Sequence, residues 1–133
     1  MDVDKFKQIF QGLNRAHGVT KVSEVNSNGN KIKGKSFIIR ENITDDHWLN
    51  HLQGKESLGV IPINDDNKCK WGCIDIDSYA GFDHKKLINK IKLLKLPLIV
   101  FRSKSGGAHV FLFTTDFIAA SVMQDKLNEI RSV

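Results

Sequence analysis

The sequence predicts an α+β fold, because segments with helical periodicity alternate with short apolar strands and no internal repeat interrupts them. At 133 residues, of which 41 % are hydrophobic and 26 % charged, the chain is long enough for one domain with its own core and too short for two ordinary ones. From residue 70 onward the expected order is strand, helix, strand, strand, helix. This order is most of a ferredoxin-like, or RRM-like, unit that lacks its last strand.

Periodicity and caps divide this single domain, residues 1–133, into a small N-terminal α/β module at 1–63 and an incomplete RRM-like module at 64–133. In the N-terminal module the patterns predict a helix, a hairpin, a second helix and a strand. These are a helix from a cap at Asp2 to about Gly18, hairpin strands "VTKVSEV" and "KSFIIR" with a turn at Asn28-Gly29, a helix capped by Thr44 and ended by Gly54, and a strand "SLGVIPI" at 57–63.

The RRM-like module contains three expected strands and two expected helices. The strands are "KWGCIDID" at 70–77, "LIVFR" at 98–102 and "AHVFLF" at 108–113, with the loop "SKSGG" between the last two. The helices are one that begins at a cap on Asp83 and continues to about Lys95, before Pro97, and a last one capped by Asp116.

The composition excludes some classes of protein. The longest apolar run, "LPLIVF" at 96–101, is far shorter than the roughly 20 residues that span a bilayer, and the charged N-terminus does not resemble a signal peptide. Cys69 and Cys73, the only cysteines, fit neither a disulfide framework nor a complete zinc site. We therefore expect a cytoplasmic protein with reduced thiols and no membrane partner.

Basic residues outnumber acidic ones, 20 against 15, which gives a net charge of +5. They cluster in two segments, and such clustering suits a polyanion such as nucleic acid. The alternative for the second cluster is the solvated face of a helix, and the sequence leaves both readings open. The clusters are Lys31, Lys33, Lys35 and Arg40, and then Lys85, Lys86, Lys90, Lys92, Lys95, Arg102 and Lys104.

The stretch "WGCIDIDSY" at 71–79 ends an apolar strand in two aspartates. Because side chains two apart on a strand share a face, Asp75 and Asp77 are expected to point together, and close carboxylates repel unless a cation lies between them. Carboxylate oxygens suit Mg²⁺ or Mn²⁺, and a two-metal site of this kind serves phosphoryl transfer. The alternative is an acidic strand end that runs into a solvated turn.

A second pattern, "FRSKSGGAHVFLF" at 101–113, places cationic, hydroxyl and glycine residues before a histidine that opens a strand. Glycines let backbone amides approach an anion, hydroxyls donate to phosphate oxygens and cations neutralise charge, so the pattern predicts a triphosphate cradle. The alternative is an ordinary hairpin turn beside a core histidine, and the histidine reaches the aspartates' face only if the strands pair in a suitable register. The cradle residues are Arg102, Ser103, Lys104, Ser105, Gly106, Gly107 and His109.

An apolar strand that ends in Asp-x-Asp, then a helix, a strand, and a small residue two before a histidine, resembles the catalytic core of the archaeo-eukaryotic primase superfamily. Within this superfamily, residues 47–120 look most like the primase-polymerase domain of the TOTE conflict systems. The segments "HLQGKESLGVIPI", "WGCIDID" and "RSKSGGAHVFLF" carry the resemblance, in that order and at similar intervals.

The resemblance implies roles for the matching residues. Asp75 and Asp77 match the family's metal-binding carboxylates, and His109, in the small-x-His motif, matches the histidine that contacts the phosphates of the incoming nucleotide. The implied activity is that of a DNA primase or polymerase that adds nucleotides on a template with two Mg²⁺ or Mn²⁺ ions, in replication or repair. The implied partners are nucleoside triphosphates, a DNA template and primer, and a helicase or nuclease in the same chain or operon.

The family also supplies a third acidic motif from a strand well downstream of the histidine, and this sequence offers no convincing substitute. We therefore expect either a fragment of a longer polymerase or a reduced relative without full activity. Two alternatives stay open, a catalytically inactive module that binds nucleotide or nucleic acid and, less favoured, a two-metal nuclease. The glycine-rich loop with its histidine argues against the nuclease.

Overall fold

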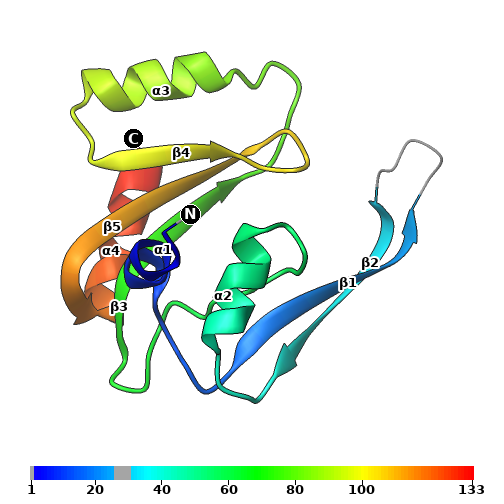
Figure 1. The fold of residues 1–133 in the computed structure, drawn as a ribbon. Helices are drawn as coiled ribbons and strands as arrows, with labels where there is room; N and C mark the ends of the chain where they lie inside the picture. Colours follow the sequence, from blue (N-terminus) through cyan, green and yellow to red (C-terminus); the bar gives the residue numbers. More distant parts are fainter. Residues whose placement is uncertain (1, 26–30) are drawn as a thin grey trace. The chain divides into compact units, whose positions relative to one another are not determined.

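The computed structural model describes residues 2–25 and 31–133 of the chain. Those residues form four helices and two small antiparallel sheets, so the chain is an α+β protein, as the sequence predicts. The elements separate into two compact units, the N-terminal unit (Met1–Asn67) and the C-terminal unit (Lys68–Val133) (Figure 1). Across the described residues, no helix combines the length and the apolar character that a membrane span requires.

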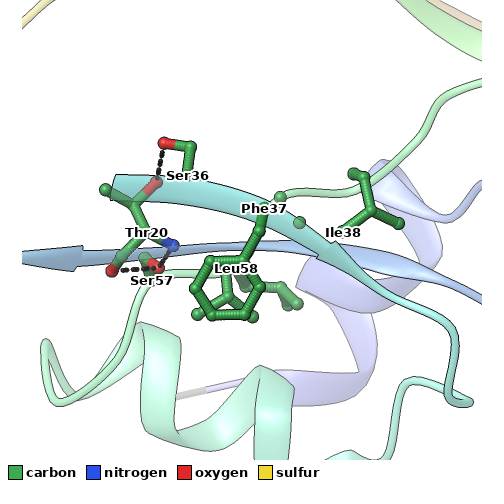
Figure 2. A pocket seen from close by; sticks show the side chains of 9 residues that line it. Thr20, Ser36, Phe37, Ile38, Ser57 and Leu58 are labelled. Carbon is green, nitrogen blue, oxygen red and sulfur yellow. Dashed lines mark hydrogen bonds between the residues drawn. The ribbon is translucent and has the colours of Figure 1, made fainter. Parts of the chain in front are cut away.

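The N-terminal unit is built around a β-hairpin. Its elements in chain order are α1 (Val3–Phe10), β1 (His17–Val25), β2 (Lys31–Ile39) and α2 (Asp45–Leu52). β1 and β2 pair antiparallel, with Lys21 opposite Lys35, so the predicted hairpin is confirmed, while its turn at Asn28-Gly29 lies outside the described residues. Phe37 and Ile38 of β2, together with Leu58, line part of a hollow of about 320 Å³ beside the hairpin (Figure 2).

The first helix is shorter than the sequence predicts. Asp2 caps it as expected, because its carboxylate accepts a hydrogen bond from Lys5 N at 3.0 Å. α1 nevertheless ends at Phe10 and does not continue to Gly18. The chain turns away because Leu13 N donates to Ile61 O at 2.8 Å, a bond that an uninterrupted helix would not allow.

The predicted strand at 57–63 is wrong, because only Gly59 pairs with β1, in a single bridge to Gly18. These two glycines exchange N–H···O bonds of 2.7 and 2.8 Å. At the next position the Ser57 hydroxyl replaces the backbone: it accepts from Thr20 N at 2.7 Å and donates to Thr20 O at 3.1 Å (Figure 2). A side chain therefore takes over where a regular ladder would continue.

The second helix of this unit has the predicted ends. Thr44 Oγ1 accepts from His47 N at 3.4 Å and His47 Nδ1 accepts from Thr44 N at 2.9 Å, which is a capping box. Gly54, just beyond the helix, has a left-handed φ of +72°. Trp48 of α2 is 2 % exposed, and its ring meets the ring of Phe6 edge-on at 5.9 Å, so it anchors the core of this unit.

The C-terminal unit has the predicted order of strand, helix, strand, strand, helix. Its elements are β3 (Lys68–Ile76), α3 (His84–Leu93), β4 (Leu98–Arg102), β5 (Ala108–Ala119) and α4 (Ala120–Arg131). The strand order in the sheet is β3-β5-β4, and both pairings are antiparallel (Figure 1). β3 and β4 therefore run in the same direction, with β5 between them.

The predicted cap at Asp116 is wrong, because β5 continues through this residue to Ala119. After an irregularity in register, β3 pairs again with the end of β5, with Cys69 opposite Ile118. The Thr114 hydroxyl lies 3.0 Å from Lys70 O and 2.7 Å from Asp116 O and can donate its one proton to either carbonyl, which holds the strand through this irregular stretch. α4 then begins without a side-chain cap.

The sheet of the C-terminal unit has two different faces, since side chains alternate along each strand. One face packs against the helices in a core centred on Cys69, Leu112 and Met123, and Cys69 belongs to it because the register shift between Cys69 and Trp71 interrupts the alternation along β3. α4 lies so close to β3 that a Cβ on Gly72 would meet Leu127 Cδ1 at 2.6 Å. The other face carries a different set of side chains, namely Trp71, Cys73, Asp75, Ile99, Phe101, His109, Phe111 and Phe113.

Candidate active site

An aspartate and a histidine from neighbouring strands meet on the open face of the C-terminal sheet. Asp75 of β3 is directly opposite His109 of β5 in the register of the pairing. His109 Nε2 lies 3.4 Å from Asp75 Oδ1, and both side chains remain accessible, at 45 % and 68 % exposure. The register that the sequence could not supply therefore brings these two predicted site residues together.

Asp77 lies just beyond the end of β3, whose last residue is Ile76, and its side chain is exposed. The glycine-rich turn approaches this segment through its backbone. A Cβ placed on Gly107 would overlap Ile76 O and would lie 2.9 Å from Ser78 N and 3.1 Å from Asp77 C. Only glycine fits this position. The backbone of the turn therefore packs directly against the backbone of the acidic segment.

The turn itself, residues 103–107, connects β4 to β5. Gly106 N donates to Ser103 O at 3.1 Å and Ser103 N donates to Gly107 O at 3.1 Å. Gly106 is the last of the three loop residues, 104–106, between Ser103 and Gly107, and it has the left-handed φ, +92°, that this position of a three-residue hairpin loop requires. Ser103 Oγ lies 3.1 Å from Ser105 Oγ, and the side chains of Arg102 and Lys104 are exposed beside them. The turn is closed and presents cations and hydroxyls to solvent.

A residue that the sequence did not single out contacts this turn. The Nε2 of His84, the first residue of α3, lies 2.8 Å from Gly107 O. The ring of Phe82 packs edge-on against the His84 ring at 4.6 Å, and Tyr79 lies 5.3 Å from Phe82. A histidine at the start of an amphipathic helix gives no sequence signal for a contact to a distant carbonyl.

The basic clusters remain surface features in both units. Lys85, Lys86, Lys90 and Lys92 are exposed along α3, and Lys35 and Arg40 are exposed in and after β2. The side chains of Lys31 and Lys33 lie outside the described part of the chain. Exposure is expected both for a polyanion-binding surface and for a solvated helix face, so it does not choose between them.

Comparison with known proteins identifies the family. The family model for the archaeo-eukaryotic primase domain of the TOTE conflict system matches residues 4–132. The chain belongs to this family. The match covers both units of this primase-family domain and places it in the primase-like nucleotidyltransferase superfamily, as the sequence resemblance predicts. No curated protein matches the chain at a significant level.

The acidic side chains at this site are candidate ligands for a hard divalent cation. Among residues 2–25 and 31–133, no three histidine, cysteine or acidic side chains are grouped closely enough to hold a metal ion by themselves. Mg²⁺ is often held by only one or two carboxylates together with substrate phosphates and water. Asp75 and Asp77 would be the carboxylates of such a site, with substrate phosphates and water as its other ligands.

Cys73 lies on the same strand face as Asp75 and is a chemical reporter for this primase-family site. Burial and, to a smaller extent, the negative charge of Asp75 raise the pKa of the Cys73 thiol. A hydrogen bond with the backbone of Val110 lowers this pKa and offsets part of the rise. Less of this thiol is ionised near pH 8 than of a free cysteine, so it is expected to react slowly with an alkylating reagent.

Asp75→Asn removes the charge that disfavours the thiolate, so the pKa of Cys73 falls. Alkylation of Cys73 by iodoacetamide near pH 8 is therefore expected to quicken, because a larger fraction of the thiol is ionised. Mass spectrometry of the labelled peptides gives the rate. Cys69 is the internal control, because burial alone raises its pKa. An unchanged rate at Cys73 would show that Asp75 does not influence it.

Proposed function

We propose that this domain binds a nucleoside triphosphate with a divalent cation and serves as the nucleotidyl-transfer domain of a primase-polymerase. The main support is the placement of His109 opposite Asp75 on a sheet face where the 103–107 turn contacts the Ile76–Ser78 backbone. Phosphate-binding and metal-binding groups would then lie at one end of the sheet. Family membership supports the reaction class.

We also propose that the C-terminal unit is an RRM-like core with three of its strands described. In an RRM-like sheet, the third strand along the chain lies between the first and the second strands and is antiparallel to both. The order β3-β5-β4 with antiparallel pairings agrees with this arrangement. The outer edge of β3, which pairs with no other strand in the described residues, is where a fourth strand would add.

Each candidate residue has a chemical role in the proposed reaction, in which a primer 3′-hydroxyl attacks the α-phosphate and pyrophosphate leaves. Asp75 and Asp77 would hold Mg²⁺ or Mn²⁺, which supplies stabilisation of the charge that develops on the phosphate oxygens. His109 would donate to a phosphate oxygen, and Arg102 and Lys104 would neutralise the triphosphate. Ser103 N and Gly106 N are already bonded within the turn, so contacts from this turn would come from its hydroxyls and other amides.

Binding without turnover is the second candidate function, and one observation favours it. The described residues contain no group of three metal-binding side chains. Ground-state binding of a metal–triphosphate complex requires fewer fixed ligands than holding two ions through a transition state. A domain with only two carboxylates at the site is therefore expected to bind better than it catalyses.

Calorimetry with Mn²⁺ and a non-hydrolysable nucleoside triphosphate tests the proposed function. We expect the unmodified protein to bind. Asp75→Asn and His109→Ala should each weaken binding about tenfold or more, because each removes a charge-assisted contact. Asp125→Asn is the matched control, because this aspartate is exposed on α4 away from the site. Absence of binding by the unmodified protein, or equal affinity in all variants, would overturn the proposal.

Two further readouts separate binding from catalysis. In a primer-extension assay with Mn²⁺, we expect weak extension or none from a protein that binds triphosphate well. Robust extension that is lost in Asp75→Asn would instead favour the polymerase over the binding module. Mg²⁺ is expected to quicken alkylation of Cys73 in the unmodified protein and not in Asp75→Asn, because the cation offsets the Asp75 charge.

A further inference from the structure

We propose that His84 is a positioning residue that holds the 103–107 turn in the shape needed to bind triphosphate. This inference rests on the proposed function of that turn. Its basis is the contact of 2.8 Å between His84 Nε2 and Gly107 O, which joins the start of α3 to a turn 23 residues later in the chain.

The chemistry of the contact fixes the donor. A carbonyl oxygen only accepts, so Nε2 of His84 carries the proton and donates. This holds for the neutral ring with its proton on Nε2 and for the charged imidazolium, which has protons on both nitrogens. The bond therefore needs only the proton on Nε2, and the role proposed for it is to orient the turn.

Gly107 O has a second donor, Ser103 N at 3.1 Å. The two lone pairs of this carbonyl are thus used by the bond that closes the turn and by the bond from His84. Together they fix the plane of the peptide that leads into Ala108, which is fully buried. The next residue is His109. A rotation of this peptide plane would therefore shift the His109 side chain, which faces Asp75.

His84 is itself held in place by its surroundings. Asp83 caps α3, accepting from Lys85 N at 2.8 Å and Lys86 N at 3.4 Å, so the first turn of the helix that carries His84 is well defined. The Phe82 ring packs edge-on against the imidazole at 4.6 Å. A donor held on a capped helix orients its acceptor better than one on a free loop.

Three variants test the role. Gln places its side-chain N–H near the position of His Nε2 and should restore the bond, Asn is too short to reach, and Leu has no donor. In calorimetry with Mn²⁺ and triphosphate, we expect His84→Leu and His84→Asn to bind about tenfold more weakly and His84→Gln to stay within about threefold of the unmodified protein. If Leu prevents folding, the comparison of Asn with Gln still decides.

Amide hydrogen exchange gives a readout that needs no ligand. The Ser103 N–H, which donates to the same carbonyl, is expected to exchange about tenfold faster in the Leu and Asn variants and near the original rate in Gln. Unchanged exchange in Leu and Asn would overturn the inference even if no triphosphate binds. Absence of binding by the unmodified protein, with exchange as expected, would count against the proposed function and leave the positioning role of His84 intact.

The pH profile separates positioning from direct contact with phosphate. If His84 only orients the turn, the affinity of His84→Gln for triphosphate should stay within the same threefold of the unmodified protein at pH 5.5 and at pH 8. A histidine that contacted phosphate as a cation would gain affinity on protonation, and the Gln variant would then fall behind at the lower pH. That result would replace the positioning role by a direct one.

Discussion

Gly107→Ala is expected to destabilise the C-terminal unit by about 3 kcal/mol and to abolish triphosphate binding. The added methyl group would overlap Ile76 O and press on Ser78 N, and both atoms belong to the backbone. A backbone cannot move aside as a flexible side chain does. The turn would have to separate from the acidic segment, which would move the cradle away from Asp75 and Asp77.

Gly81→Ala is the matched control for this variant. Gly81 has a left-handed φ of +86°, and a Cβ there would meet nothing within 4 Å, so alanine costs only the conformational strain of about 1 kcal/mol. Urea denaturation gives both free energies of unfolding, and calorimetry gives both affinities. Equal effects of the two substitutions would mean that the turn does not contact the 76–78 backbone.

Trp48→Ala is expected to destabilise the N-terminal unit by about 3–5 kcal/mol, because it removes a large side chain that is 2 % exposed. The chain contains two tryptophans, Trp48 and Trp71, one in each unit. In this variant the remaining fluorescence comes from Trp71 alone. Urea denaturation can therefore be followed in the C-terminal unit by fluorescence and in the whole chain by circular dichroism.

This experiment also tests the prediction that residues 1–133 form a single domain. The reference is Trp48→Phe, a milder substitution. If the two units unfold together, the urea midpoints from Trp71 fluorescence and from circular dichroism should both be lower in Trp48→Ala than in Trp48→Phe. A Trp71 midpoint that stays at the Trp48→Phe value would mean that the C-terminal unit folds independently, contrary to the prediction.

Local patterns predicted most of the elements and failed where the partner of a segment decided its structure. The caps at Thr44 and Asp83 are set by bonds within a few residues, so the sequence was sufficient there. Asp116 looks like a cap, but pairing with β3 extends β5 through it. The segment 57–63 has strand composition, yet the Ser57 hydroxyl takes the bonds that a strand would make.

The candidate site shows the same division. Alternation along β3 and β5 predicted which faces Asp75 and His109 could occupy, but their position opposite each other depends on register, which connects residues distant in the chain. The contact of His84 with Gly107 O could not be predicted, because it joins a side chain to a backbone oxygen across 23 residues. Patterns with a period of two or of 3.6 carry no information on such a bond.

The short outer strand β4 has a consequence for self-association. An edge strand offers unpaired backbone groups to other chains, and β4 also exposes Ile99 and Phe101 at 51 % and 48 %. The strand follows Pro97, which has no N–H to donate, and its last residue is Arg102, whose exposed charge disfavours pairing of this edge with another chain. Arg102, for which we propose a role in triphosphate binding, thus also helps to protect this edge of the sheet from pairing with another chain.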